Sequence, residues 1–225
     1  MLKNKEDFPM TPRERMLTAM WNKKPDMVPV ALDISNMIPC KLTGKPFWNI
    51  YLYQDPPLWL AFINAVKYFK FDGWFTYGEL LFRYKNDERI FNRKIASRTD
   101  ERIIEVITCS TPKGDLWMER TYYIADPPTD TRKWIKDIKQ DFPKIKYFFP
   151  EITGYDDELF KEQRKLLGED GAFGVSIEVP GIHNLHGWFD GGAPSAIYAY
   201  YDNYELIKEF VNLPRFTGHQ VKSYN

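Results

Sequence analysis

Short apolar runs alternate with amphipathic helical segments along this chain, and this alternation constrains the fold more than any other feature. Apolar runs at residues 28–32, 71–76 and 172–177 have the length of buried strands. Residues 12–21, 58–69 and 156–167 instead carry apolar side chains at helical spacing. Strands that alternate with helices usually pair in parallel, with the helices outside the sheet. We therefore expect an α/β fold.

The first helix has the clearest start signal. Thr11 and Glu14 form a capping box, in which each side chain can bond the backbone N–H of the other residue. Pro12 stands at the first helical position, where its missing N–H costs nothing. Further helices are predicted at residues 131–141, 194–201 and 203–211, and Gly168 suits the end of the helix at 156–167.

The middle of the chain breaks the alternation. Residues 101–109 and 116–124 are β-rich and are joined by a turn-rich link, which predicts an antiparallel hairpin inserted into the α/β pattern. The pattern contains about three βα units. A closed (β/α)8 barrel takes about 250 residues, and this chain spends many of its residues on the hairpin, so it cannot hold eight units. We expect one incomplete domain over residues 1–225, with a first helix and strand in 9–32, the hairpin at 101–124 and an atypical tail at 213–225.

Composition excludes several classes of protein. Lys and Arg together number 31, as do Asp and Glu, and this balance argues against a general nucleic-acid or membrane-surface binder. Cys40 and Cys109 are too few for a disulfide framework and indicate reduced thiols. The N-terminus has no apolar signal core, and no apolar run reaches the roughly 18 residues of a membrane span. We expect a cytoplasmic protein without nucleic-acid or membrane partners.

Polar side chains follow the first two predicted strands. Asp33, Ser35 and Asn36 come directly after residues 28–32, and Glu79 follows residues 71–76. Because α/β enzymes place their chemistry at the carboxyl ends of strands, we predict substrate binding by the first three and a catalytic role for Glu79. The alternatives are local turn or capping bonds for the first three, and a solvated loop carboxylate for Glu79.

A polar, aromatic loop follows the third predicted strand. It holds His183 and His186, and Glu178 precedes it. Histidine titrates near neutral pH, so we predict catalytic roles for His183 and His186, with Glu178 as a substrate contact. A small metal site would also suit these three residues. The break at Pro180 and Gly181 favours histidines bonded to backbone or water, and we expect no metal.

Two aromatic residues complete the predicted site. Trp188 and Tyr123 could wall a pocket for an aromatic substrate, and we assign both to substrate binding. Core packing is the alternative for both, because the chain is rich in aromatic side chains. Cys109 lies in a predicted strand and is expected to be inert packing.

Two N-terminal segments resemble a known superfamily. Residues 10–20, MTPRERMLTAM, and residues 24–30, KPDMVPV, resemble the opening of the uroporphyrinogen decarboxylase superfamily. LTG at 42–44, Asp55-Pro56, FKFDGW at 69–74 and VPG at 179–181 look more like its branch of cobalamin-dependent (corrinoid) methyltransferases. The resemblance covers roughly residues 10–212. It implies a partial (β/α)8 TIM barrel of the uroporphyrinogen decarboxylase-like type, with a pocket at the carboxyl ends of its strands.

Departures from the decarboxylase pattern favour the methyltransferase branch. Decarboxylase members carry an arginine-rich loop after the first strand, whereas residues 33–39, DISNMIP, contain no arginine. They carry an aspartate after the second strand, where this chain has Tyr77, Gly78 and Glu79, and a later tyrosine whose nearest match here is about His186. Decarboxylation of a tetrapyrrole needs cations that hold its carboxylates. It remains the alternative function.

Methyltransferase members bind zinc through a His-x-Cys pair and a later cysteine. This chain has no His-x-Cys, and no cysteine follows Cys109. We expect a truncated member that is inactive alone and holds no cofactor, whereas zinc and a corrinoid serve the full-length family. The implied reaction moves a methyl group between a small methylated substrate or thiol and a corrinoid protein. A third hypothesis is a non-catalytic half-barrel that associates with a partner, or with itself as a homo-oligomer, through open sheet edges.

Overall fold

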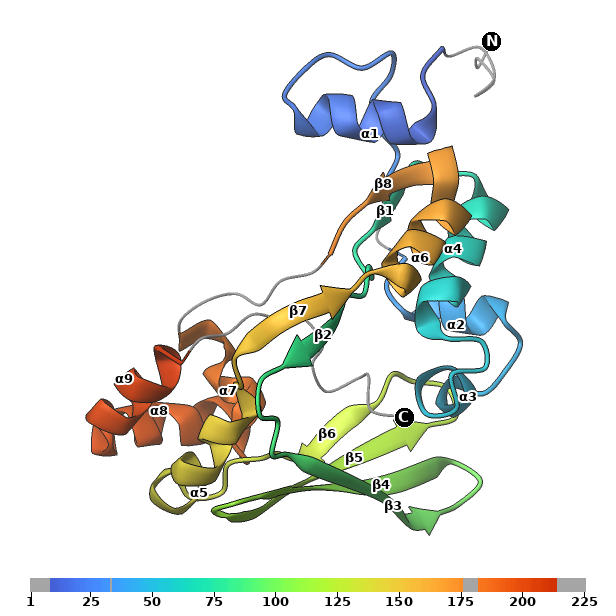
Figure 1. Cartoon of the computed structure of the whole chain (residues 1–225). Coiled ribbons are helices and arrows are strands. Elements are labelled where there is room, and N and C mark those ends of the chain that lie inside the picture. Colours follow the sequence, from blue (N-terminus) through green and yellow to red (C-terminus); the bar gives the residue numbers. More distant parts are fainter. Residues whose placement is uncertain (1–8, 33, 176–181, 214–225) are drawn as a thin grey trace. The chain divides into compact units, whose positions relative to one another are not determined.

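The computed structural model describes residues 9–32, 34–175 and 182–213, and Figure 1 shows their helices and strands. These residues form a mixed α/β structure in which no closed barrel is present. They divide into two compact units. Unit 1 comprises residues 1–80, 125–127 and 156–176, and unit 2 comprises residues 81–124, 128–155 and 177–225. No helix in the described ranges is long and apolar enough to cross a membrane.

Unit 1 consists mainly of helices beside a short parallel sheet. Its elements are α1 (Pro12–Met20), α2 (Met37–Leu42), α3 (Phe47–Tyr51), α4 (Leu58–Phe69), β1 (Gly73–Phe75), α6 (Glu158–Leu167), the 3-10 helix η3 (Gly168–Asp170) and β8 (Gly171–Phe173). Strands β1 and β8 pair in parallel, with Trp74 opposite Ala172 (Figure 1). Glycine is required at 171, because a Cβ there would collide with the backbone of Gly73.

Of the two N-terminal predictions for unit 1, the helix start is correct and the strand is not. The capping box is confirmed: the Glu14 N–H donates to Thr11 Oγ1 at 3.2 Å, and the Thr11 N–H donates to Glu14 Oε2 at 2.8 Å. The buried strand predicted at 28–32 is wrong, since these residues form no strand and leave Val28 and Leu32 exposed. Apolar composition alone does not make a strand, and Pro29 has no N–H to give to a ladder.

A buried ion-pair network ties α1 to the start of β1. The Arg15 guanidinium is fully buried and donates from Nη1 to Asp72 Oδ1 at 2.6 Å and from Nε to Asp26 Oδ1 at 2.7 Å. Its Nη2 donates to the Met10 carbonyl at 2.8 Å and to Asp26 Oδ2 at 3.0 Å. The second Asp72 oxygen accepts from the Val30 N–H at 2.8 Å. The network therefore gives each of these buried charges a partner.

The core of unit 1 lies between α4, α6 and the β1–β8 pair. The face of α4 predicted from its spacing is largely confirmed, because Phe62, Ile63 and Val66 are buried whereas Phe69 is half exposed. The ring of Phe75 in β1 stacks on that of Phe173 in β8 with centroids 4.9 Å apart. The helix predicted at 156–167 is confirmed as α6 but begins at Glu158, because Asp156 ends β7, and Gly168 caps it with a φ of 59°.

Unit 2 is built on an antiparallel sheet. Its elements are β2 (Leu81–Tyr84), β3 (Ile90–Arg98), β4 (Arg102–Thr111), β5 (Gly114–Tyr123), β6 (Thr129–Arg132), α5 (Ile138–Ile145), the 3-10 helix η2 (Lys146–Phe148), β7 (Ile152–Asp156), the 3-10 helix η4 (Ile182–Asn184), α7 (Leu185–Trp188), α8 (Gly192–Asp202) and α9 (Tyr204–Val211). Strands β2 and β7 form a separate pair. The predicted hairpin is confirmed as β4 and β5, but β3 and β6 flank it in a four-stranded sheet.

The helix predicted at 131–141 begins later than the spacing suggested. Residues 129–132 form β6, and α5 begins at Ile138. The start is set by Asp137, whose side chain accepts from the Lys139 N–H at 2.8 Å as an N-cap. The helices predicted at 194–201 and 203–211 are confirmed as α8 and α9. Of the atypical tail, only Leu213 lies within the described residues.

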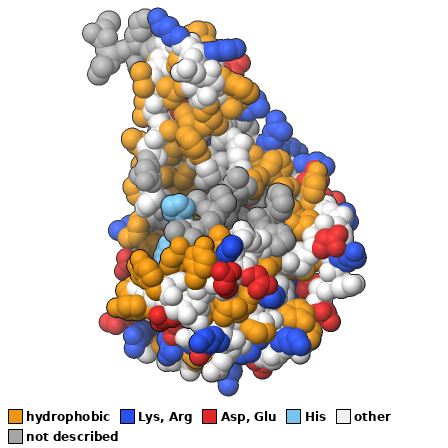
Figure 2. Space-filling model, turned by 90° about the vertical axis from the view of Figure 1, so that its left-hand side faces the viewer, with side chains coloured by type: hydrophobic (Ala, Val, Ile, Leu, Met, Phe, Trp, Pro, Cys, Tyr) orange, Lys and Arg blue, Asp and Glu red, His pale blue; other side chains and the backbone are white. Residues whose placement is uncertain are grey.

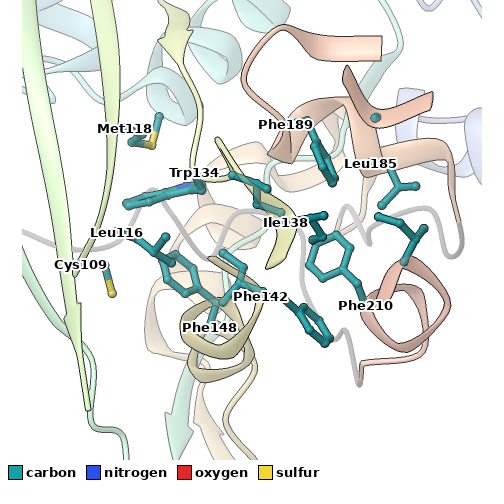
Figure 3. Packing of buried hydrophobic residues seen from close by; sticks show 14 of the residues in the cluster. Cys109, Leu116, Met118, Trp134, Ile138, Phe142, Phe148, Leu185, Phe189 and Phe210 are labelled. Carbon is teal, nitrogen blue, oxygen red and sulfur yellow. The ribbon is translucent and has the colours of Figure 1, made fainter. Parts of the chain in front are cut away.

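The core of unit 2 forms where helices pack against one face of this sheet. Strands β4 and β5 contribute Cys109, Leu116 and Met118, all buried (Figure 3). Phe142 from α5 and Phe210 from α9 face each other with ring centroids 6.2 Å apart. The alternating burial along β4 is the pattern of a strand with one covered face.

Removing the Arg15 guanidinium will destabilise unit 1 strongly. Arg15→Met leaves two carboxylates without their cation in a buried site, so we expect a loss of about 3–5 kcal/mol in the free energy of unfolding. Amide hydrogen exchange of α1 and β1 under increasing urea measures it. The control is Arg13→Met, because Arg13 makes only an exposed 3.5 Å pair with Glu169 and is expected to cost less than about 1 kcal/mol. Equal losses in the two variants would contradict the central role of Arg15.

The same network makes unit 1 sensitive to acid. The hydrogen bond from Arg15 lowers the pKa of Asp26 from 3.8 to about 2. Because the folded pKa lies below the unfolded one, the ion pair contributes fully above about pH 4 and its contribution is lost as the pH falls to about 2. Wild type and Asp26→Asn should therefore converge in unfolding free energy between about pH 4 and pH 2, measured by urea unfolding. A constant difference across that range would contradict the assignment.

Candidate functional site

A pocket of about 290 Å³ lies at the carboxyl end of β1 in unit 1. Its lining consists of Ala31, Leu32, Ile34, Ser35, Phe62, Trp74, Thr76 and Tyr77. Three of these side chains carry hydroxyl groups, three are aromatic, and none of the described lining residues is charged. The pocket brings together residues 31–32 and 34–35, which form no strand, and residues within β1 or directly after it, and only the second group is at a strand end as predicted.

Tyr77 forms one wall of this pocket and is held at both ends. Its ring contacts the rings of Phe62 and Phe75, with centroids 5.1 Å and 5.6 Å away. Its hydroxyl donates to Asn36 Oδ1 at 2.5 Å. Asn36, which was predicted to bind substrate, is therefore bonded to a tyrosine that was not predicted to belong to the site, and its neighbour Ser35 lines the pocket.

The backbone at the start of α2 determines how Ser35 and Asn36 are presented. Ser35 has a φ of 46°, in the left-handed region that residues with a Cβ rarely adopt. Its Oγ accepts from the Met37 N–H at 3.1 Å. Asn36 is the N-cap of α2, yet its side chain makes no capping hydrogen bond. The amide oxygen of Asn36 is used by Tyr77 instead.

Two buried polar groups lie behind Tyr77. Burial raises the pKa of the Cys40 thiol to about 11, so Cys40 stays protonated and unreactive at neutral pH. Burial also raises the pKa of Tyr51 well above its usual range. The Tyr51 hydroxyl is buried beside the Cys40 thiol and the Asn36 side chain, without a hydrogen bond of standard geometry to either. These groups support the fold around the pocket and do not supply a nucleophile.

Glu79 follows β1, as predicted, but it is not among the residues that line the pocket. Its backbone N–H donates to Oε1 of Gln163 at 3.0 Å, and Gln163 is fully buried in α6. The position of residue 79 is thus fixed by a helix side chain. Its catalytic role stays a prediction.

The predicted loop site lies in unit 2. His183 and His186 are both exposed, and Figure 2 shows histidine side chains at the surface. His186 Nδ1 lies 2.9 Å from the carbonyl oxygen of His183, so one ring nitrogen is engaged by backbone. Trp188 is half-buried against Phe149 and Phe210, with ring centroids 5.5 Å and 5.7 Å away. These contacts agree with the alternative prediction, in which Trp188 packs in the core.

Of the other predicted residues, only Tyr123 lies within the described part of the chain, and it is not at the β1 pocket. Tyr123 ends β5 and lines a wide, shallow hollow beside residues 99–102 of the same sheet. Asp33 and Glu178 lie outside the described residues. Within the described ranges, no group of three or more His, Cys, Asp or Glu side chains is arranged to hold a metal ion. The pocket at β1 is therefore the best-defined site.

Sequence reasoning missed the aromatic half of this pocket. Phe62 was predicted as core from its helical spacing, and it does pack in the core while also lining the pocket. Trp74 is 52% exposed although it lies within a strand between two buried neighbours, and alternation along β1 was the available signal. Tyr77 directly precedes Gly78 and Glu79, so the sequence already indicated that it follows the predicted strand.

Comparison with known proteins identifies no relative: no family model, no curated protein and no solved structure matches this chain. The pocket geometry and the residues around it are therefore the basis for a functional proposal.

Removing the buried Tyr51 hydroxyl will stabilise unit 1. Tyr51→Phe eliminates a buried hydroxyl that makes no hydrogen bond of standard geometry to its neighbours Cys40 and Asn36, so we expect the free energy of unfolding to rise by about 1 kcal/mol. Urea unfolding followed by hydrogen exchange of α2 and α4 measures it. Tyr68→Phe is the matched control, because Tyr68 is 67% exposed and should change stability by less than about 0.5 kcal/mol. A loss of stability in Tyr51→Phe would show that the hydroxyl has a partner.

Proposed function

We propose that the pocket of unit 1 binds a small, uncharged methylated substrate. In line with the sequence resemblance, we further propose that the chain is a partial (β/α)8 barrel of the methyltransferase branch, and that the reaction moves a methyl group between that substrate, or a thiol, and a corrinoid protein. A cytoplasmic location belongs to the same proposal. The observation that carries it is a strand-end pocket whose described lining is aromatic and hydroxylic, without charge.

The size and chemistry of the pocket favour this substrate class. Sites for small molecules range from about 300 to 1,000 Å³, so a pocket of about 290 Å³ suits a ligand at the small end. The faces of Phe62, Trp74 and Tyr77 offer apolar surface to a methyl or methoxy group. Hydroxyls of Ser35 and Thr76 can orient the ligand, because hydroxyls both donate and accept hydrogen bonds.

Decarboxylation of a tetrapyrrole is less well supported. Such a substrate carries several carboxylates, and a protein site binds them most effectively with arginine. The described lining of the pocket contains neither arginine nor lysine. Arg15 belongs to unit 1 but is fully buried and paired with Asp26 and Asp72.

The described residues do not fit the zinc site that the resemblance implies. Zinc is bound by deprotonated thiolates, often together with histidine. Cys40 and Cys109 are both buried and unpaired, and burial raises their thiol pKa values to about 11 and about 12. They belong to different units of the chain. The proposed function therefore contains no step through zinc on these residues.

A binding experiment with 2-methoxyphenol tests the proposal. We expect the purified full chain to bind it, and Trp74→Ala to weaken the affinity about tenfold, which corresponds to about 1.4 kcal/mol for one lost aromatic contact. Titration calorimetry measures both dissociation constants. Because Trp74 is half exposed, truncating it should leave the fold intact.

The matched control is Trp21→Ala, since Trp21 is 75% exposed in unit 1 and does not line the pocket. We expect no change in affinity for this variant. Equal weakening by the two variants would refute the pocket as the binding site. Binding of a polycarboxylic porphyrin in place of 2-methoxyphenol would instead support the decarboxylase alternative.

A further inference from the structure

Two consecutive residues at the pocket depart from their usual local preferences. Asparagine at an N-cap normally bonds a backbone N–H in the first turn of the helix, but Asn36 makes no such bond. Ser35, its neighbour, adopts the left-handed region at φ 46° although it is not glycine. Unfavourable backbone conformations persist only where surrounding structure enforces them. One local bond acts on this segment, from the Met37 N–H to Ser35 Oγ at 3.1 Å, and a contact with a distant residue adds to it.

The contact with a distant residue is the hydrogen bond from Tyr77 to Asn36. This bond joins residues 41 positions apart in the sequence, and so links the segment after β1 to the start of α2. The Tyr77 ring is clamped by Phe62 of α4 and Phe75 of β1, which leaves its hydroxyl little freedom to follow Asn36 if Asn36 moves. The Tyr77 side chain is thus fixed by core packing and bonds Asn36 from the core side.

We propose that Tyr77 is a positioning residue of the pocket. Through Asn36 it holds Ser35 in the left-handed conformation, so that the Ser35 side chain forms a fixed part of the pocket lining. A wall that is ordered before binding spares the ligand the entropy of ordering it. The consequence for affinity rests on the proposed function of the pocket, whereas the consequence for the Ser35 backbone does not.

The backbone consequence is tested without ligand. The 13Cα and 13Cβ chemical shifts of Ser35 report its backbone conformation and can be measured by NMR in the full chain. We expect them to move from left-handed toward extended values in Tyr77→Phe and equally in Asn36→Ser. Serine keeps a good N-cap at position 36, so this variant should fold even if the tyrosine variant does not. Tyr198→Phe, altered at an exposed tyrosine of unit 2, should leave the shifts unchanged.

Unchanged Ser35 shifts in folded Asn36→Ser would overturn the proposal, because the hydrogen bond would then be only a structural link between α2 and β1. Such a link would lower stability without altering the conformation of residue 35.

The affinity consequence is tested by a double-mutant cycle with 2-methoxyphenol. We expect Tyr77→Phe and Asn36→Ser each to weaken binding about tenfold, because each removes the hydrogen bond that orders the pocket wall. The double variant should bind no more weakly than either single variant. Additive effects, or no weakening, would refute a positioning role in binding. Failure of the wild-type chain to bind 2-methoxyphenol would refute the proposed function alone, and the Ser35 shifts would still decide the positioning.

Discussion

The buried guanidinium of Arg15 is the interaction on which unit 1 depends. A cation removed from water is tolerated only when its donors find acceptors, and here Met10, Asp26 and Asp72 accept four hydrogen bonds from it. Asp72 also receives the Val30 N–H, and its own backbone N–H bonds the Val30 carbonyl at 2.9 Å. Asp72 therefore holds the 28–32 segment beside β1 through its carboxylate and its backbone N–H, although the two segments do not pair as strands.

The buried ion pairs of unit 1 and its pocket lie at opposite ends of β1. The charged side chains of the Arg15 network satisfy one another, and the pocket at the other end of β1 is left to hydroxyl and aromatic groups. Tyr77 links the pocket to the surrounding core, because its ring packs with the Phe62 cluster and against the cluster around Cys40. The described lining residues offer a ligand hydroxyl groups, ring faces and aliphatic side chains, and this supports the proposed small uncharged substrate.

Local signals in the sequence predicted the elements that are stabilised locally. The capping box fixed the start of α1, and helical spacing identified α4, α6 and α9. Strand β3 was missed because nearly all of its side chains are exposed, so its stability comes from pairing with β4 and its sequence has no apolar run. The same limit applies to the site. Strand-end position suggested Ser35 and Asn36, but the role of Tyr77 depends on a contact between distant residues.

The connection between β1 and β8 has a consequence for the order of folding. The two strands pair directly, yet the whole β3–β6 sheet lies between them in the sequence. Closing a long loop costs more chain entropy than closing the short turns within that sheet. During synthesis on a ribosome, the antiparallel sheet can thus form before β8 has been made and has paired with β1. The parallel pair, together with the packing of α6 beside it, must be a late event in the life of each newly made chain.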